Sequence, residues 1–131
     1  MAIVIFYEKP DCINNKRQKK LLQKSGHTVT ALSLLEEAWT ADRLEYFLKD
    51  VPRSKWFNKS APDIKSGRIK PEQLNAQQSL KVMVENPLLI ARPLMQVSNE
   101  YMSGFDLETV HNWIGLNVSD FNLDLETCLK Q

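Results

Sequence analysis

The most informative pattern for the fold is in residues 3–12, Ile3-Val4-Ile5-Phe6-Tyr7-Glu8-Lys9-Pro10-Asp11-Cys12. The first five residues are β-branched or aromatic, as in a buried strand, and Pro10 and Asp11 then require a loop. Because the apolar run is continuous rather than alternating, we expect a central strand that is covered on both faces. Cys12 is therefore predicted to lie in a loop at the carboxyl end of the first strand.

The segments that follow Cys12 predict a βαβ unit. A helical pattern runs to Lys24, and Gly26 stands just beyond its end. Residues 27–34 alternate and are rich in β-branched side chains, which predicts a second strand. A strand, a helix and a strand in this order imply parallel pairing through a right-handed crossover. The predicted core face of the helix consists of Ile13, Arg17, Leu21 and Leu22.

The middle of the chain predicts a helical block. Thr40 can cap a helix over residues 40–49, and Pro71 is suited to the first position of a helix over residues 71–85. Between them we expect a short helical turn at residues 55–58 and mostly loop over residues 61–71.

Sheet returns near the C-terminus. Pro93 cannot occupy the middle of a hydrogen-bonded strand, so we expect it to begin the strand over residues 94–97. A turn then leads to a short strand at residues 101–102, and Asp106 caps a helix that ends near Ile114.

These elements make one α/β domain over residues 1–115, with a helical insert over about residues 38–85 and a tail over residues 116–131. The tail either docks as a last helix or frays. The chain has 131 residues, of which 43% are hydrophobic and 25% charged, and its net charge of +1 argues against coating nucleic acid or a membrane. No stretch reaches the ~18–20 apolar residues of a membrane span, and no secretory signal is visible, so we expect a cytoplasmic protein.

The chain has two cysteines, Cys12 and Cys128, which is too few for a disulfide scaffold or a four-cysteine zinc site. His27 and His111 have no metal-ligand spacing, so we expect them to be surface or packing residues and expect no metal site. Trp39, Trp56 and Trp113 are scattered, which indicates core or semi-buried anchors rather than a stacking platform.

Cys12 is the main candidate for chemistry. A helix N-terminus favours a thiolate over a thiol, and Lys9, Lys16 and Arg17 add positive charge nearby. The alternative is that Cys12 is an inert, small buried residue. The cations over residues 16–24 either attract an anionic peptide or glutathione, or form the solvated face of the helix.

Arg92 is the second candidate, because a guanidinium offers a fixed fork of donors to an oxyanion or a carboxylate. If the bond between Arg92 and Pro93 is cis, it would place Arg92 next to another loop. The alternative is a surface ion pair between Arg92 and a carboxylate such as Glu85.

Two motifs resemble a known family. Glu8-Lys9-Pro10-Asp11-Cys12 and Asn86-Pro87-Leu88-Leu89-Ile90-Ala91-Arg92-Pro93 are similar to motifs of the thioredoxin-fold arsenate reductases and their Spx-type regulator relatives. The resemblance covers about residues 2–114 and implies an α/β, thioredoxin-like fold, with a four-stranded mixed sheet flanked by helices and a helical insert. Phe6 to Pro10, Trp56-Phe57-Asn58 and Pro87 to Met95 further resemble the nitrogenase-associated branch of that family.

The resemblance implies a nucleophile at Cys12 and an oxyanion-binding arginine at Arg92. Positions expected to contact the substrate are Asp11, Asn15, Lys16, Asn58 and Pro93, the last as the wall opposite Cys12. Two further family arginines fall at about Asn58 and at residues 103–105, where this sequence has none. Their loss weakens stabilisation of a charged oxyanion and therefore the case for arsenate reduction, unless Arg53, Lys55 or Lys59 substitutes in part.

Redox relatives often carry a second cysteine three residues after the first, and Asn15 occupies that position here. A cycle at Cys12 then needs glutathione, another protein or Cys128 to resolve a mixed disulfide. We expect a monomeric thiol oxidoreductase without a bound cofactor, with glutathione as co-substrate or glutaredoxin as partner. The alternative is a non-catalytic adaptor that binds a protein partner, a metalloenzyme assembly or RNA polymerase, without contacting nucleic acid directly or a membrane.

Overall fold

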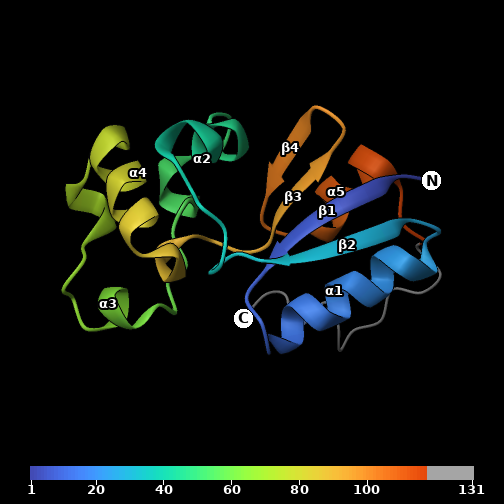
Figure 1. Ribbon diagram of the computed structural model, residues 1–131, viewed down its shortest axis with the longest axis horizontal. Coiled ribbons are helices and arrows are strands. Elements are labelled where there is room, and N and C mark those ends of the chain that lie inside the picture. Colours follow the sequence, from blue (N-terminus) through green and yellow to red (C-terminus); the bar gives the residue numbers. More distant parts are fainter. Residues whose placement is uncertain (118–131) are drawn as a thin grey trace.

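The computed structural model describes residues 1–117, and Figure 1 shows the course of the chain. The strands are β1 (Ile3–Glu8), β2 (Thr28–Ser33), β3 (Leu94–Val97) and β4 (Glu100–Ser103). The helices are α1 (Ile13–Lys24), α2 (Ala41–Leu48), α3 (Pro62–Lys65), α4 (Ala76–Glu85) and α5 (Leu107–Ile114). Short 3₁₀ helices cover Arg53–Lys55, Pro71–Gln73 and Pro87–Leu89. Most of the predicted tail, with Cys128, lies outside the described residues.

The four strands form one mixed sheet in the order β2-β1-β3-β4. β1 and β2 run parallel, and α1 makes the crossover between them, as the βαβ pattern predicts. β3 is antiparallel to both β1 and β4. β1 is therefore an inner strand, which confirms the central position expected from its continuous apolar run.

The side chains of β1 alternate between two apolar cores, as the pleat of a strand requires. Val4 and Phe6 are fully buried under α1 and α5, together with Leu22 and Val110. Tyr7 points into a second core that joins the sheet to the helical insert. In that core the ring of Tyr7 meets the rings of Trp39 and Phe47 edge to face. In Figure 1 the insert, with α2 to α4, lies beside the sheet. Cys12, in the loop after β1, lines a cavity together with insert residues such as Asn58.

The predicted core face of α1 is partly wrong. Leu21 and Leu22 are buried, but Ile13 is 67% exposed and Arg17 is exposed. Asn15 and Gln18 take the buried positions instead. Their side-chain amides hydrogen-bond each other, with Asn15 Nδ2 donating to Gln18 Oε1 over 2.9 Å, so the polar groups are paired inside the protein.

The insert departs from the sequence prediction at two points. α4 begins at Ala76 rather than at Pro71, because Asn75 and Gln78 form a capping box that sets the helix start. Pro71 opens only a 3₁₀ turn. α3 adds one short helix within a segment that was expected to be mostly loop. The predicted caps at Thr40 and Asp106 are confirmed.

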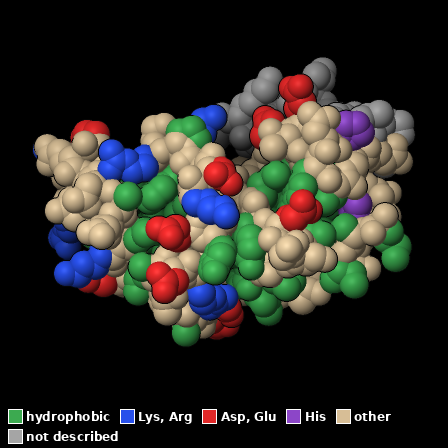
Figure 2. Space-filling view, turned by 90° about the horizontal axis from the view of Figure 1, so that it is seen from above, with side chains coloured by type: hydrophobic (Ala, Val, Ile, Leu, Met, Phe, Trp, Pro, Cys, Tyr) green, Lys and Arg blue, Asp and Glu red, His purple; other side chains and the backbone are tan. Residues whose placement is uncertain are grey.

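His27 has a packing role. Its Nδ1 accepts from the backbone N–H of Ala2 over 2.9 Å, and its Nε2 lies 2.6 Å from the carbonyl oxygen of Gly115. Figure 2 shows both histidines at the end of the molecule away from the insert, and β1 runs from that end towards Cys12. Within residues 1–117 no three His, Cys, Asp or Glu side chains are placed to share a metal ion, and no helix there has the length and apolarity to cross a membrane.

Candidate active site

Cys12 is the N-cap residue of α1, directly after the loop that leaves β1. Its backbone N–H donates to the carbonyl oxygen of Lys9 over 3.2 Å, and its own carbonyl accepts from the N–H of Lys16 over 3.1 Å. Asp11 precedes it with φ +68°, a left-handed conformation that aspartate tolerates better than most residues. The loop therefore turns sharply and leaves the half-buried thiol at the free N–H groups of the helix.

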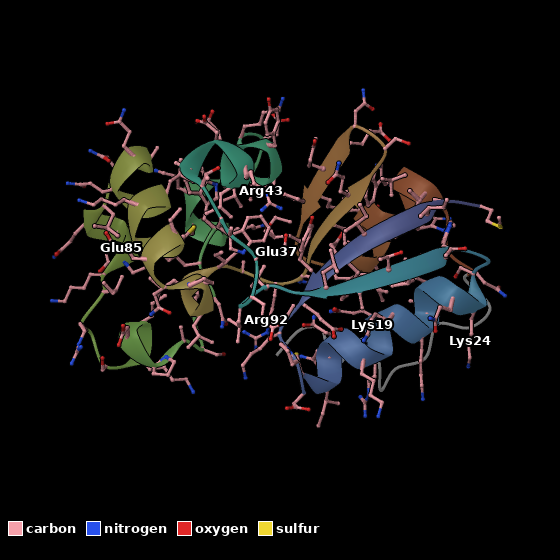
Figure 3. All side chains as sticks on the ribbon, viewed as in Figure 1. Lys19, Lys24, Glu37, Arg43, Glu85 and Arg92 are labelled. Carbon is pink, nitrogen blue, oxygen red and sulfur yellow. The ribbon has the colours of Figure 1, made fainter. Side chains whose placement is uncertain are left out.

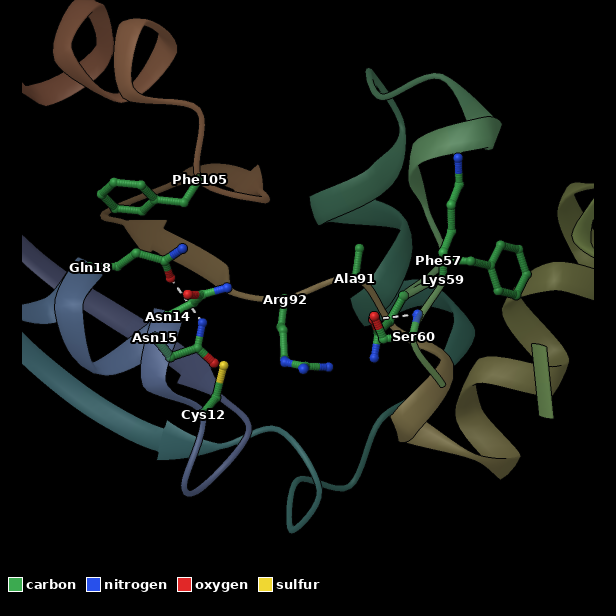
Figure 4. Close-up of a pocket in the computed structure, with 11 residues that line it drawn as sticks. Cys12, Asn14, Asn15, Gln18, Phe57, Lys59, Ser60, Ala91, Arg92 and Phe105 are labelled. Carbon is green, nitrogen blue, oxygen red and sulfur yellow. Dashed lines mark hydrogen bonds between the residues drawn. The ribbon is translucent and has the colours of Figure 1, made fainter. Parts of the chain in front are cut away.

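The buried side-chain amide of Asn15 holds this loop in place by a hydrogen bond to its backbone. Asn15 is 2% exposed, and its Oδ1 accepts from the backbone N–H of Lys9 over 3.1 Å. Its Nδ2 donates to Gln18, which is 4% exposed (Figure 4). Asn15 was predicted to contact a substrate. It does line the cavity described below, but its amide is already bonded within the protein at both ends.

Arg92 reaches the same place from a segment that joins the insert to β3. Two backbone hydrogen bonds tie this segment to the insert, from Ala91 N–H to the Trp56 carbonyl over 2.9 Å and from Asn58 N–H to the Leu89 carbonyl over 2.8 Å. The peptide bond between Arg92 and Pro93 is cis.

The alternative of an ion pair between Arg92 and Glu85 is wrong. Figure 3 shows Arg92 between the sheet and the insert, with Glu85 well away from it on α4. Glu85 is exposed, and none of the ion pairs within residues 1–117 includes Arg92. The guanidinium of Arg92 lies beside the thiol of Cys12 instead (Figure 4).

The surroundings of Cys12 lower the pKa of its thiol. Burial acts in the opposite direction and would raise the pKa, but the backbone N–H of Asn15 and the side chain of Arg92 donate hydrogen bonds that favour the thiolate. The positive charge of Arg92 and the backbone N–H of Asn14 add to this effect. The net result is a pKa below the ordinary value of a cysteine, which is the condition for a nucleophilic thiol near neutral pH.

A cavity of about 320 Å³ opens between Cys12 and Arg92 (Figure 4). Of the residues predicted for the site, it brings together Cys12, Arg92, Asn15 and Asn58. Asp11 and Lys16 instead line a neighbouring hollow that shares Cys12 with the first. Pro93 is buried and is not part of the lining of either hollow.

Sequence reasoning missed Gln18 and Ser60, which also line the cavity. The signal for Gln18 was its spacing of three residues from Asn15, which places both amides on one face of a helix. No local pattern marked Ser60.

Residues at the two positions where the family resemblance implies arginines also border this cavity. Asn58 and Phe105 both line it, and neither side chain carries a positive charge. The cationic side chains of its lining are Arg92 and Lys59, and Figure 4 shows the Lys59 amine turned away from Arg92. Arg53, considered as a substitute, donates to the carbonyl oxygen of Leu74 over 3.0 Å and does not line this cavity.

Known proteins share this architecture. Residues 13–113 match the ArsC family. An uncharacterized 15.7 kDa protein in the draG 3' region of Rhodospirillum rubrum is 46% identical over 131 residues, which cover 100% of this chain and 91% of that protein. The global transcriptional regulator Spx 2 of Bacillus anthracis is 21% identical over 127 residues, or 95% of this chain and 97% of that protein.

Among solved structures, an arsenate reductase from Vibrio cholerae superposes with a TM-score of 0.70 at 21% identity, covering 85% of this chain and 97% of that one. This likeness confirms the thioredoxin-like fold with its mixed four-stranded sheet flanked by helices. Because the family match extends over most of the chain, the protein belongs to the ArsC family.

Proposed function

We propose that this protein is a thiol oxidoreductase that reacts through Cys12 and is coupled to glutathione or glutaredoxin. The observation that carries the proposal is the position of the thiol, which is half-buried at the N-terminus of α1, lies beside the guanidinium of Arg92 and borders a cavity. A thiol stabilised as the thiolate at an accessible helix end is typical of redox-active cysteines.

The proposed first step is thiol–disulfide exchange. The Cys12 thiolate attacks one sulfur of a disulfide such as glutathione disulfide, a bond forms between the two sulfurs, and the other half leaves as a thiolate. Arg92 faces the reacting sulfur and can bind a carboxylate of the substrate. Asn15 occupies the position of a second cysteine, so a thiol from outside residues 1–117 must resolve the mixed disulfide.

Arsenate is a less suitable substrate for this cavity. An arsenate ion carries charge on several oxygens, and fixed cations around it supply much of the stabilisation in the transition state. Asn58 and Phe105 give no such charge, and the Lys59 amine is turned away. We therefore expect disulfide exchange to be much faster than arsenate reduction.

The test compares wild type with Cys12→Ala, and uses Cys128→Ser as the matched control for loss of a cysteine. Each protein is assayed for adduct formation with glutathione disulfide, for reduction of a small disulfide other than glutathione disulfide by glutathione, and for arsenate reduction in the presence of glutathione and glutaredoxin. We expect wild type and Cys128→Ser to form a glutathione adduct and to turn over disulfide, and Cys12→Ala to do neither. Equal activity of wild type and Cys12→Ala would overturn the proposal.

The second candidate function is a non-catalytic adaptor for a protein partner. It is favoured by the same three positions: Asn58 and Phe105 line the cavity without a cation, and Asn15 replaces the second cysteine. A pull-down with Cys12→Ser separates the two candidates. Unchanged partner capture supports the adaptor, whereas loss of capture, or a disulfide-linked partner seen only with wild type, supports redox chemistry.

A further inference from the structure

Cys12 borders two hollows rather than one. The first is the cavity that contains Arg92, and the second, of about 330 Å³, is lined by Lys9, Ile13, Lys16 and their neighbours. The first turns of α1 divide them. Asn14, Asn15 and Gln18 line the Arg92 cavity, whereas Ile13, Lys16 and Lys19 line the second hollow. A sulfur atom bonded to Cys12 in one hollow therefore leaves the other hollow accessible from outside.

The second hollow carries excess positive charge. Lys19 is paired with Glu8 over 2.6 Å, so these two charges cancel. The ammonium groups of Lys9 and Lys16 make none of the ion pairs found within residues 1–117, and the remaining carboxylate in the lining is that of Asp11. Two cations against one anion favour an acidic ligand.

Ile13 adds an apolar contact to this charged surface. Its side chain is 67% exposed although it stands directly beside Cys12. A single exposed isoleucine needs no explanation by itself. Next to a thiol with a lowered pKa and between two unpaired lysines, it offers a contact that glutathione, which has no large apolar side chain, would not use.

We propose that Lys9, Ile13 and Lys16, here called the lysine face, dock a dithiol protein whose reactive cysteine is flanked by acidic and apolar side chains. This inference rests on the proposed function of Cys12. The docked protein resolves the mixed disulfide from the side opposite Arg92. Its thiolate attacks Cys12 Sγ, a new disulfide to the partner forms, and the substrate thiolate leaves from the Arg92 cavity. The partner's second thiol then breaks the new disulfide, so the partner is oxidised and the Cys12 thiolate is released.

Attack from this side agrees with the chemistry of disulfide exchange, in which the attacking, central and leaving sulfurs lie nearly in line. With the leaving group beside Arg92, the attacking thiol must come from across α1, where the lysine face lies. The charge of the face then raises the rate of encounter with an acidic protein.

The test uses full-length protein with Cys128→Ser, loaded at Cys12 with 5-thio-2-nitrobenzoate, an anionic aromatic thiol whose release is coloured. Two peptide thiols are compared at low and high salt: one carries glutamates and a leucine beside its cysteine, and the other carries lysines and a leucine. We expect the acidic peptide to release the reporter about tenfold faster at low salt, and the two rates to converge at high salt. Equal rates at low salt would overturn the inference.

Variants locate the effect. Lys9→Glu with Lys16→Glu should bring the ratio of acidic to basic rates near one, whereas Lys20→Glu with Lys24→Glu, exposed positions outside both hollows, should preserve most of it. Ile13→Ser should slow the acidic peptide but not glutathione. Docking at this face would be contradicted if Lys20→Glu with Lys24→Glu lowered the ratio of acidic to basic rates as much as Lys9→Glu with Lys16→Glu. It would also be contradicted if Ile13→Ser left the rate of the acidic peptide unchanged.

The two proposals fail separately. If Cys12 does not accept the reporter at all, the proposed function fails. If Cys12 loads readily but release is indifferent to peptide charge, only the docking inference fails. The salt dependence is measured on protein with an unaltered lysine face, so it decides the question even if a charge-reversed variant does not fold.

Discussion

Replacing Asn15 with alanine tests whether the buried amide holds the Cys12 loop. The change removes the hydrogen bond from Lys9 N–H to Oδ1, at 3.1 Å, and the hydrogen bond from Nδ2 to Gln18 Oε1, at 2.9 Å. It leaves two groups without a partner, one of them on a side chain that is only 4% exposed. An unpaired buried polar group costs about 1–3 kcal/mol, and the Lys9 N–H nearer the surface costs the low end of that range. We therefore expect the free energy of unfolding to fall by about 2–4 kcal/mol.

Urea unfolding followed by circular dichroism measures this loss. Asn14→Ala is the matched control, because Asn14 is the neighbouring residue on α1, is only half-buried and should change the unfolding free energy by less than about 1 kcal/mol. Asn15→Asp keeps an acceptor for Lys9 N–H but places a negative charge near Cys12, so it should raise the pKa of the thiol. A loss below 1 kcal/mol in Asn15→Ala would refute the structural role of the amide.

Three further outcomes are expected. Arg92→Met removes a hydrogen bond and a positive charge that lower the pKa of Cys12, so the rate of alkylation against pH should shift to higher pH, as iodoacetamide kinetics would show. Met83→Ala, at a fully buried position, should lower the free energy of unfolding by about 2–5 kcal/mol in urea, and an unchanged midpoint would contradict the core packing. Asp106→Ala removes the cap on Thr109 N–H and should cost about 1 kcal/mol at neutral pH. The pKa of Asp106 is lowered chiefly by its hydrogen bonds with Thr109. The stability that the cap adds is therefore fully present above the pKa of Asp106 in the unfolded chain, and it is lost as the pH falls through the lower pKa of the folded protein. If Asp106→Ala lost stability in acid to the same extent as wild type, this contribution of the cap would be refuted.

The sheet and most helix starts could be predicted because their signals are local. The apolar run of β1 and the capping residues Thr40 and Asp106 act within a few residues of themselves. The start of α4 was misplaced because two local signals compete. Pro71 suits a first helical position, but the box formed by Asn75 with Gln78 satisfies more of the free N–H groups.

The buried face of α1 could not be predicted from hydrophobicity. An amphipathic pattern puts apolar side chains inside, yet Asn15 and Gln18 are buried because each satisfies the other. Ile13 is correspondingly exposed.

The prediction that Cys12 and Arg92 share one site came from the family resemblance, because no local sequence pattern relates the two residues. It depends on contacts between distant segments, in particular the bridge between Phe57 and Ile90 that fixes the course of the chain before Arg92.

The proposed chemistry requires that Cys12 is stabilised as a thiolate. The most direct measurement is the pH titration of its ultraviolet thiolate absorbance in full-length protein with Cys128→Ser, so that one thiol titrates. We expect a pKa for Cys12 clearly below the ~8.5 of a free cysteine, and a rise in that pKa when Arg92 is replaced by methionine. A pKa at or above the ordinary value, unchanged in Arg92→Met, would contradict it.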